Sequence, residues 1–561
     1  MSAAEPLRVA LAQINPTVGD LEGNAAKIAE WIGLARAEGA GLVIFPELCL
    51  PGYPAEDLYL KRHFLLANRS ALEELAAGVS GITALVGFAE PAPDSASRPA
   101  ANAIGVLAEG RVQAIYRKGR LPNYAVFDEQ RYFEPGGEPV VIDVEGRGIG
   151  LTICEDCWVE GPPASLEAAR GAEVIANPSG SPYHRGKGRK RELMFAERAR
   201  AYGVHFAFSN LVGGQDELVF DGHSVVLDPS GELIARAAQF EEELLLCEIP
   251  AGAPAGLAEP LSEVAEVYTA LVVGLRDYVE KNGFRHVGIA LSGGVDSALV
   301  ALIAVDALGP ERVSCVVMPS PHSSPATQAD ARSIAANLGV GLIEIEIEPM
   351  MAGYEQALAE PFGSASGDGS GPEKLPRDPT RPSEPDLAAE NIQARIRGNL
   401  MMALSNKHGW LVLTTGNKSE MSVGYATLYG DMAGGFAVIK DVPKTLVYEL
   451  VRFRNERDAE RPIPPSVLER APSAELRPAQ LDSDSLPPYD LLDAILEAYV
   501  ERDLGREQIV AAGMPPDVVE EVIRMVDRSE YKRRQAPPGI RITPKAFGRD
   551  RRLPITNRFG G

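Results

Sequence analysis

The sequence predicts an α/β protein of two domains, each built on its own sheet. The chain has 561 residues, whereas a single hydrophobic core stops growing at roughly 250 to 300 residues. Apolar runs of strand length alternate with helical stretches along the chain. Hydrophobic residues make up 45% and charged residues 24%, which is ordinary for a globular protein. No apolar run reaches the ~18 residues of a membrane span, so we expect no membrane contact.

The first domain is predicted over residues 1–250, with the pattern of a layered α/β domain. Helical spacing and composition predict helices over 24–38 and 190–202. Short apolar runs typical of β-strands lie between and around them, at 9–14, 41–45, 84–88, 149–153, 174–176, 205–208 and 224–227.

The second domain is predicted over residues 263–561, after a linker at 251–262 that is rich in proline, glycine and alanine. A helix at 264–281 precedes strand patterns at 287–291, 313–318, 342–347 and 411–415. Strands that alternate with helices in this way predict a doubly wound parallel sheet. Glycine, serine and proline dominate residues 360–386, where we expect a mobile loop. The tail after Gln535 either has no fixed conformation or covers a neighbouring subunit.

The charge and the cysteines restrict the partners and the compartment. A net charge of −23 gives no general attraction to phosphate backbones, so we expect no nucleic acid partner. A nucleotide ligand is not excluded, because local amides, cations and a metal hold its phosphates. Five cysteines in so long a chain form no disulfide framework, and the N-terminus lacks the pattern of a signal peptide. We therefore expect a cytoplasmic protein.

Residues 292–297, Ser-Gly-Gly-Val-Asp-Ser, connect a predicted strand to a helical run at 298–308. Glycines let backbone amides approach an anion, and the helix N-terminus and two hydroxyls add hydrogen-bond donors. The pattern predicts a phosphate site at which Asp296 can hold magnesium. A tight turn that only caps the helix is the alternative interpretation. The Gly-x-x-x-x-Gly-Lys pattern of the P-loop does not occur.

This segment resembles the ATP pyrophosphatase family, and four later motifs resemble its NAD synthetase branch, in the order 390–397, 414–420, 472–476 and 531–532. The resemblance implies that ATP is cleaved to AMP and pyrophosphate while a carboxylate is adenylated, and that an amine then displaces AMP. The ATP contacts that it implies are Leu291, Ser292, Gly293, Gly294, Val295, Asp296, Ser297, Ala298, Thr415 and Lys444.

The same resemblance implies a second substrate, deamido-NAD, and a Mg²⁺ cofactor held by Asp296 and Glu420. Taken singly, such residues also fit surface charges, a helix cap or a salt bridge. Three positions, Leu428, Gly435 and Tyr531, depart from the lysine, aspartate and histidine of single-domain relatives, so the contacts at the nicotinate end stay open. The implied contacts to deamido-NAD are Asn391, Arg395, Glu420 and Lys532.

Three short motifs of the first domain carry residue types that suit amide hydrolysis by a thiol, at 45–47, 116–118 and 153–158. A thiol that attacks an amide needs a base and a cation or donor for the oxyanion, roles that Glu47 and Lys118 can fill. The alternatives for Cys154 are a buried core cysteine, or half of a redox or metal pair with Cys157. A zinc site needs two further ligands, and the sequence has no second cysteine pair.

These motifs and their flanks at 117–124, 126–133 and 177–183 resemble the carbon-nitrogen hydrolase, or nitrilase, family over about the first 250 residues. The resemblance implies a catalytic triad of glutamate, lysine and cysteine with a second active-site carboxylate, and glutamine as the substrate. The implied catalytic residues are Glu47, Lys118, Cys154 and Glu129, and the implied glutamine contacts are Tyr124, Ser181 and Lys187.

An amidase fused to an adenylating ligase indicates that one supplies ammonia to the other. The two resemblances together imply that deamido-NAD, ATP and glutamine yield NAD, AMP, pyrophosphate and glutamate, in a homo-oligomer. A shielded path for ammonia is a further hypothesis. Two alternatives stay open: another glutamine-fed adenylating amidoligase, or a metabolite-binding protein with inactive sites.

Overall fold

The computed structural model describes residues 6–93, 95–250, 256–362, 387–458 and 461–559. Residues 251–255 of the predicted linker and 363–386 of the predicted loop lie outside these ranges. The chain divides into two compact units: unit 1 is Met1–Lys281 with Arg541–Lys545, and unit 2 is Asn282–Ile540 with Ala546–Gly561. Within the described ranges, no helix has both the length and the apolarity that a membrane crossing requires.

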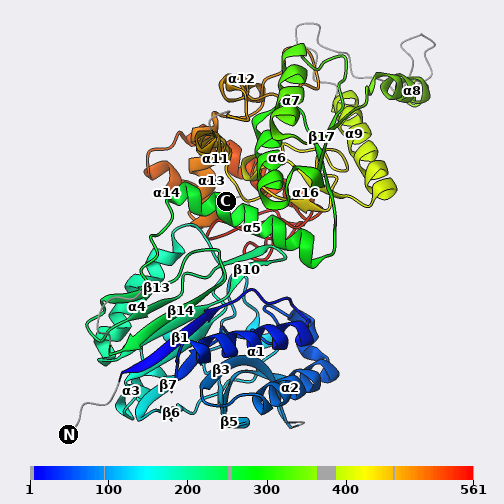
Figure 1. Cartoon of the computed structure of the whole chain (residues 1–561). Helices are drawn as coiled ribbons and strands as arrows, with labels where there is room; N and C mark the ends of the chain where they lie inside the picture. Colours follow the sequence, from blue (N-terminus) through cyan, green and yellow to red (C-terminus); the bar gives the residue numbers. More distant parts are fainter. Residues whose placement is uncertain (1–5, 94, 251–255, 363–386, 459–460, 560–561) are drawn as a thin grey trace. The chain divides into compact units, whose positions relative to one another are not determined.

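Unit 1 contains two six-stranded sheets and a separate two-stranded ribbon (Figure 1). In spatial order the first sheet is β14 (Glu243–Ile249), β1 (Leu7–Gln13), β2 (Leu42–Ile44), β3 (Thr83–Pro91), β4 (Ala100–Ala108) and β5 (Arg111–Arg117). The second sheet is β13 (Leu233–Arg236), β12 (Val225–Leu227), β9 (His205–Asn210), β8 (Val174–Ser179), β7 (Arg147–Leu151) and β6 (Val141–Val144). The ribbon pairs β10 (Val212–Gln215) with β11 (Leu218–Asp221).

Side chains of alternate strand positions build the layers of unit 1. In β1, Val9 and Leu11 join a core cluster that contains residues of both sheets, so this cluster lies between the sheets. The intervening Ala10 and Ala12 join a second cluster that includes residues of α1 (Leu21–Ala37) and α2 (Arg62–Ala77). A third cluster joins the second sheet to α3 (Ala164–Ala169) and α4 (Lys187–Tyr202). The layers are therefore helix, sheet, sheet and helix, which confirms the predicted layered α/β fold.

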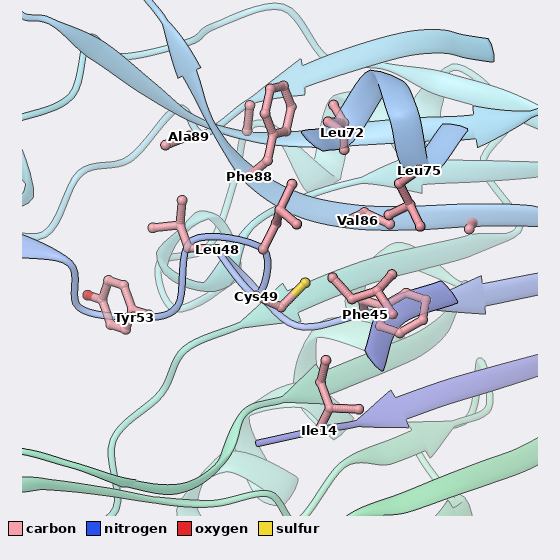
Figure 2. Close-up of a cluster of buried hydrophobic side chains, with 14 of the residues drawn as sticks. Ile14, Phe45, Leu48, Cys49, Tyr53, Leu72, Leu75, Val86, Phe88 and Ala89 are labelled. Atoms are coloured by element: carbon pink, nitrogen blue, oxygen red, sulfur yellow. The ribbon is translucent and has the colours of Figure 1, made fainter. Parts of the chain in front are cut away.

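The chain after β2 is anchored in the second of these clusters (Figure 2). Phe45, Leu48 and Cys49 of this segment are fully buried, and they lie beside residues of β3 and α2. Gly87 of β3 permits this close approach, because a Cβ there would lie 2.4 Å from the carbonyl oxygen of Pro46. The anchoring fixes the backbone on both sides of position 47, which carries one of the predicted catalytic residues.

Helix α5 (Glu263–Lys281) follows the predicted linker but belongs to unit 1. Asp277 of α5 accepts hydrogen bonds from Gly214 N and Asn15 Nδ2, both at 2.7 Å. Part of the tail also belongs to unit 1, where Arg541 donates from its backbone N to the carbonyl of Glu217 at 2.9 Å. The chain thus completes unit 1 with two segments that lie beyond the first 250 residues.

Unit 2 contains the predicted parallel sheet, with the order β17 (Gly341–Glu344), β16 (Val313–Val317), β15 (Val287–Ala290), β18 (Leu411–Thr414) and β19 (Phe436–Ala437). Every pairing in it is parallel. The order reverses between β15 and β18, and at such a switch point ligands bind at the carboxyl ends of the strands.

The helices of unit 2 connect and flank this sheet. The helices that precede the last strand, β19, or directly follow it are α6 (Val295–Leu308), α7 (Pro325–Leu338), α8 (Glu348–Leu358), α9 (Leu387–His408), α10 (Lys418–Val423) and α11 (Lys444–Arg457). The later ones are α12 (Pro465–Glu469), α13 (Tyr489–Leu496), α14 (Arg506–Ala511), α15 (Pro516–Arg528) and α16 (Glu530–Arg533).

Candidate active sites

The predicted catalytic residues of unit 1 come from separate segments and meet in its interior. Glu47 follows β2, Lys118 follows β5, and Cys154 begins a 3-10 turn after β7. Lys118 Nζ donates to Glu47 Oε1 at 2.6 Å and to Glu129 Oε1 at 2.9 Å. None of these three residues and Glu129 is more than 3% exposed. Two carboxylates thus share one buried ammonium beside the candidate nucleophile.

Neighbouring donors hold the two carboxylates in place. Asn102 Nδ2 and Gly180 N donate to the two oxygens of Glu47, each at 2.7 Å. Tyr53 OH donates to Glu129 Oε1 at 3.3 Å. Burial and the nearby Glu47 charge raise the pKa of Glu129 to about 7, against the effect of Lys118.

The charge of Lys118 is secured by its partners. Burial disfavours the ammonium, but Glu129 and Glu47 outweigh that effect, so the pKa of Lys118 is raised well above its usual range. An ammonium that stays charged in a dry site can stabilise a developing oxyanion.

Cys154 has features of a nucleophile that needs a base. Its φ of 42° lies in the left-handed region, which non-glycine residues seldom adopt and which clusters at functional sites. Burial, and next the charge of Glu47, raise the pKa of its thiol well above the usual range. The free protein therefore carries a thiol rather than a thiolate, and attack requires a group such as Glu47 to accept the proton.

The residues predicted to bind glutamine lie in loops around Cys154 and at the start of α4. Ser181 is 1% exposed, and its hydroxyl has no hydrogen-bond partner among the described residues. Tyr124 is half exposed and donates to Glu155 Oε2 at 3.0 Å. Lys187 donates to the Pro182 carbonyl at 2.8 Å, and burial lowers its pKa to about 7. An ionised Cys154 would act to raise the pKa of both Tyr124 and Lys187, which places both side chains near it.

Unit 2 contains a cavity of about 680 Å³ at the carboxyl ends of β15 and β18. Every residue predicted to bind ATP or deamido-NAD lines it, except Ala298, which is buried within α6. Of the three departures from single-domain relatives, Leu428 and Tyr531 line the cavity. Gly435 is not among the lining residues, and a Cβ there would lie 2.5 Å from Leu411 Cδ1.

The glycine turn between β15 and α6 opens into this cavity. Gly293 has a φ of 83°, and a Cβ there would lie 2.1 Å from the Thr327 carbonyl oxygen, so only glycine fits. Ser297 Oγ donates to the Gly294 carbonyl at 3.0 Å and fixes the turn. The N-terminus of α6 follows directly, and its partial positive charge favours a phosphate group.

A group of two acids and one lysine lies at the wall of this cavity. Lys444 Nζ lies 2.5 Å from Asp296 Oδ2 and 3.1 Å from Glu420 Oε1. Asn417 Nδ2 donates to Asp296 Oδ1 at 2.8 Å. Burial, together with the charge of Asp296, raises the pKa of Glu420 to about 7 even though Lys444 opposes this shift.

These acids fit a magnesium ion. Mg²⁺ prefers carboxylate oxygens and is usually held by one or two of them together with substrate phosphates. No cluster of three or more histidine, cysteine, aspartate or glutamate residues suited to a metal occurs in the described part of the chain. A magnesium site that substrate phosphates complete does not require such a cluster.

The other predicted contacts to deamido-NAD also line the cavity. Asn391 Oδ1 accepts from Thr427 Oγ1 at 2.7 Å, and Arg395 Nε donates to the Leu428 carbonyl at 3.2 Å. Lys532 Nζ donates to the carbonyl of Gly424 at 2.7 Å.

Two cations of the cavity wall were not predicted. Arg470 Nη1 donates to the carbonyl of Gly293 at 3.4 Å and so adjoins the glycine turn. Arg397 donates to the Met318 carbonyl at 3.0 Å, and burial lowers its pKa to about 10. The sequence could have indicated both arginines, because Arg397 lies within the motif at 390–397 and Arg470 lies two residues before the motif at 472–476.

Comparisons with known proteins match the two parts of the chain to two families. Residues 8–254 match the carbon-nitrogen hydrolase family, and residues 267–536 match the NAD synthase family. The chain is similar to the glutamine-dependent NAD(+) synthetases of Thermotoga maritima, with 46% identity over 99% of both chains, and of Xanthomonas campestris, with 47% identity over 100% of this chain and 99% of the relative.

A solved structure extends the similarity to the fold of the whole chain. The glutamine-dependent NAD+ synthetase of Acinetobacter baumannii, in complex with ADP, has a TM-score of 0.76 and 41% identity, and the match covers 99% of each chain.

The fold and the sites define a protein with a carbon-nitrogen hydrolase domain and an NAD synthase domain in one chain. Relatives named glutamine-dependent NAD(+) synthetase match at least 99% of its length. The chain belongs to the family of glutamine-dependent NAD(+) synthetases.

Proposed function

We propose that this protein is a ligase that makes NAD from deamido-NAD, ATP and the amide nitrogen of glutamine. The observation that carries the proposal is the presence, in one chain, of the buried group at Cys154 and the phosphate-binding turn at 292–297. The first suits release of ammonia from an amide, and the second suits activation of a carboxylate by ATP.

In unit 1, Glu47 takes the thiol proton as Cys154 Sγ attacks the side-chain amide carbon of glutamine. The oxyanion that forms is stabilised by the Lys118 ammonium. The tetrahedral intermediate collapses when Glu47 returns the proton to nitrogen, so ammonia leaves and a thioester remains. Water then attacks the thioester, with Glu47 as its base, and releases glutamate.

The α-carboxylate and the α-ammonium of glutamine require one cationic and one anionic partner. Lys187 would bind its carboxylate, and the unpartnered Ser181 hydroxyl would add a hydrogen bond. Its α-ammonium needs an acceptor, and the sequence patterns assigned none. Glu155 directly follows Cys154 and already accepts from Tyr124 OH. We propose Glu155 as the acceptor for the α-ammonium.

In unit 2, the carboxylate oxygen of deamido-NAD attacks the α-phosphorus of ATP, and pyrophosphate leaves. Ammonia then attacks the acyl carbon, and AMP leaves with the electron pair of the broken C–O bond. The amides of the glycine turn and Lys444 hold the phosphates. Asp296 and Glu420 would hold Mg²⁺, which neutralises phosphate charge when bound.

Further features of the function extend this proposal. Deamido-NAD would lie against Asn391, Arg395 and Lys532, with Leu428 and Tyr531 at the same wall. The five cysteines are free thiols, which supports a reducing compartment such as the cytoplasm. We also propose a homo-oligomer, on the family resemblance alone.

The test is Cys154→Ala, with Cys247→Ala, another buried cysteine of unit 1, as the matched control. We expect Cys154→Ala to abolish NAD formation with glutamine and to preserve it with ammonium, because only the first uses the thiol. The control should retain both activities. The measurement is NAD and AMP formed from deamido-NAD and ATP with each nitrogen source.

The outcome also separates the proposal from its alternatives. AMP formed with another acid but not with deamido-NAD would identify a different adenylating amidoligase. No AMP with any acid would indicate a metabolite-binding protein without catalysis. Loss of both activities in Cys154→Ala would contradict the division of labour between the units.

A further inference from the structure

Asp156 carries a fully buried carboxylate that accepts four hydrogen bonds. Its Oδ2 accepts from Tyr116 OH at 2.7 Å and from Ile153 N at 3.0 Å. Its Oδ1 accepts from Gly119 N at 3.1 Å and from Arg120 N at 2.8 Å. Each carboxylate oxygen of Asp156 therefore accepts two hydrogen bonds, although Asp156 takes part in no step of the proposed mechanism.

The four donors belong to the two segments that carry the nucleophile and the oxyanion lysine. Tyr116 and Gly119 flank Lys118 at the end of β5, which is an edge strand of the first sheet. Ile153 precedes Cys154 after β7, in the second sheet. One carboxylate thus connects two segments that no strand pairing joins.

A buried carboxylate is costly unless donors compensate it. Burial raises the pKa of Asp156, and the bonds from Tyr116 and the backbone, together with the charge of Lys118, oppose that shift. Simple packing would be served as well by an apolar residue of the same size. A carboxylate at this position is explained if its four hydrogen bonds have a role beyond packing.

Catalysis requires the geometry that these bonds maintain. Cys154 has a strained backbone, with a φ of 42°, and such residues persist only where the surroundings hold them. Lys118 is tied to β4 through its own backbone N, which donates to the Asn102 carbonyl at 2.8 Å. After Lys118 the chain leaves the sheet, and its next two amides donate to Asp156.

We infer that Asp156 is a positioning residue of the glutaminase site, which sets Cys154 against Lys118 without touching the substrate. The inference rests on the proposed function, because it concerns the glutamine reaction. It assigns a role to a residue of the motif at 153–158 to which sequence patterns gave none.

The test variant is Asp156→Asn, which keeps the size and replaces one acceptor oxygen by a donor. We expect kcat for glutamine hydrolysis to fall about 10- to 100-fold, because a misplacement of ~1 Å costs about 10²-fold. The KM for glutamine should change by less than about threefold, and ammonium-dependent NAD synthesis should be unchanged. A role in stability alone would lower the amount of folded protein and leave kcat per folded protein unchanged.

Two further variants sharpen the comparison. Tyr116→Phe removes one of the four bonds, and we expect a smaller loss of kcat, of about 3- to 10-fold. Asp143→Asn is the matched control, because Asp143 is exposed and its side chain accepts a local hydrogen bond from Gly146 N, in the turn between β6 and β7. The control should keep the kcat of the unchanged chain.

Several results would overturn the inference. These are an unchanged kcat in Asp156→Asn, a loss confined to KM, or an equal loss with glutamine and ammonium. If Asp156→Asn does not fold, Tyr116→Phe decides, and an unchanged kcat in that variant refutes the positioning role. Failure of the proposed function is distinguishable, because the unchanged chain would then release no glutamate from glutamine.

Discussion

At the scale of single residues, Lys187 links the glutamine site to pH. Burial lowers its pKa to about 7, so the free protein loses this positive charge as pH rises through 7. Binding of a carboxylate needs the ammonium. We therefore expect the KM for glutamine to rise above pH 7, approaching about tenfold for each further pH unit.

Lys187→Arg tests this dependence, because a guanidinium stays charged at every accessible pH. The KM of this variant for glutamine should be nearly constant between pH 6.5 and 8.5, whatever its absolute value. Lys190→Arg, at an exposed position of the same helix, is the control and should retain the rise. A constant KM in the unchanged chain, or the same rise in Lys187→Arg, would contradict the role of Lys187.

Residue types and motif order pointed to groups that the fold brings together, and what they left unassigned has a physical reason. Glu47 and Lys118 are 71 residues apart and still form a direct bond of 2.6 Å, so motif chemistry had identified groups that the fold brings together. Asn102 and Asp156 were not assigned. Their roles are hydrogen bonds to other segments, and such bonds depend on tertiary structure rather than on local pattern.

At the scale of elements, short apolar runs predicted many of the strands, and they missed others, including β4, which is buried along almost its whole length. β4 and β5 were not predicted. β4 is rich in alanine, a weak strand former, and the edge strand β5 carries Arg111, Gln113 and Arg117 with most of its residues partly exposed. A pattern based on burial gives little signal for an edge strand.

Helix α13 connects the elements that carry the cluster of acids and lysine in unit 2. Its Asp493 accepts from Ser419 Oγ, and it accepts from Thr445 N at 3.0 Å and from Thr445 Oγ1 at 2.8 Å. Ser419 precedes Glu420 in α10, and Thr445 follows Lys444 in α11. One carboxylate therefore links the segments that carry Glu420 and Lys444, two members of that cluster.

Asp493→Asn should weaken this alignment. We expect kcat/KM for ATP to fall about tenfold, which corresponds to a loss of roughly 1.4 kcal/mol, close to the lower limit of about 1.5 kcal/mol for a hydrogen bond to a charged group. The loss should be equal with glutamine and with ammonium, because both reactions use the same adenylation. The measurement is AMP formation at varied ATP, and Asp490→Asn, an exposed position of α13, should show no loss. A loss seen only with glutamine would argue against this role.

At the scale of the whole molecule, the two units are not simple halves of the sequence. Unit 1 includes α5, which directly follows the linker predicted at 251–262, and the short segment Arg541–Lys545, which lies almost 280 residues after that linker. A linker is predicted from local composition, whereas membership of a unit depends on packing that composition does not encode. The doubly wound sheet of unit 2 was predictable because each of its longer strands is a separate apolar run.

The pairing of two activities in one chain makes a prediction about the origin of the nitrogen. Ammonia in neutral water is mostly protonated, and ammonium has no lone pair with which to attack the adenylate. Nitrogen released at Cys154 therefore benefits from transfer before it equilibrates with the solvent. With amide-¹⁵N glutamine and an equal concentration of unlabelled ammonium, we expect NAD to carry mostly ¹⁵N, as mass spectrometry would measure. Cys154→Ala should give unlabelled NAD in the same mixture. If the labelled fraction instead follows the bulk ammonium pool as that pool is increased, the released ammonia mixes with solvent and direct transfer is refuted.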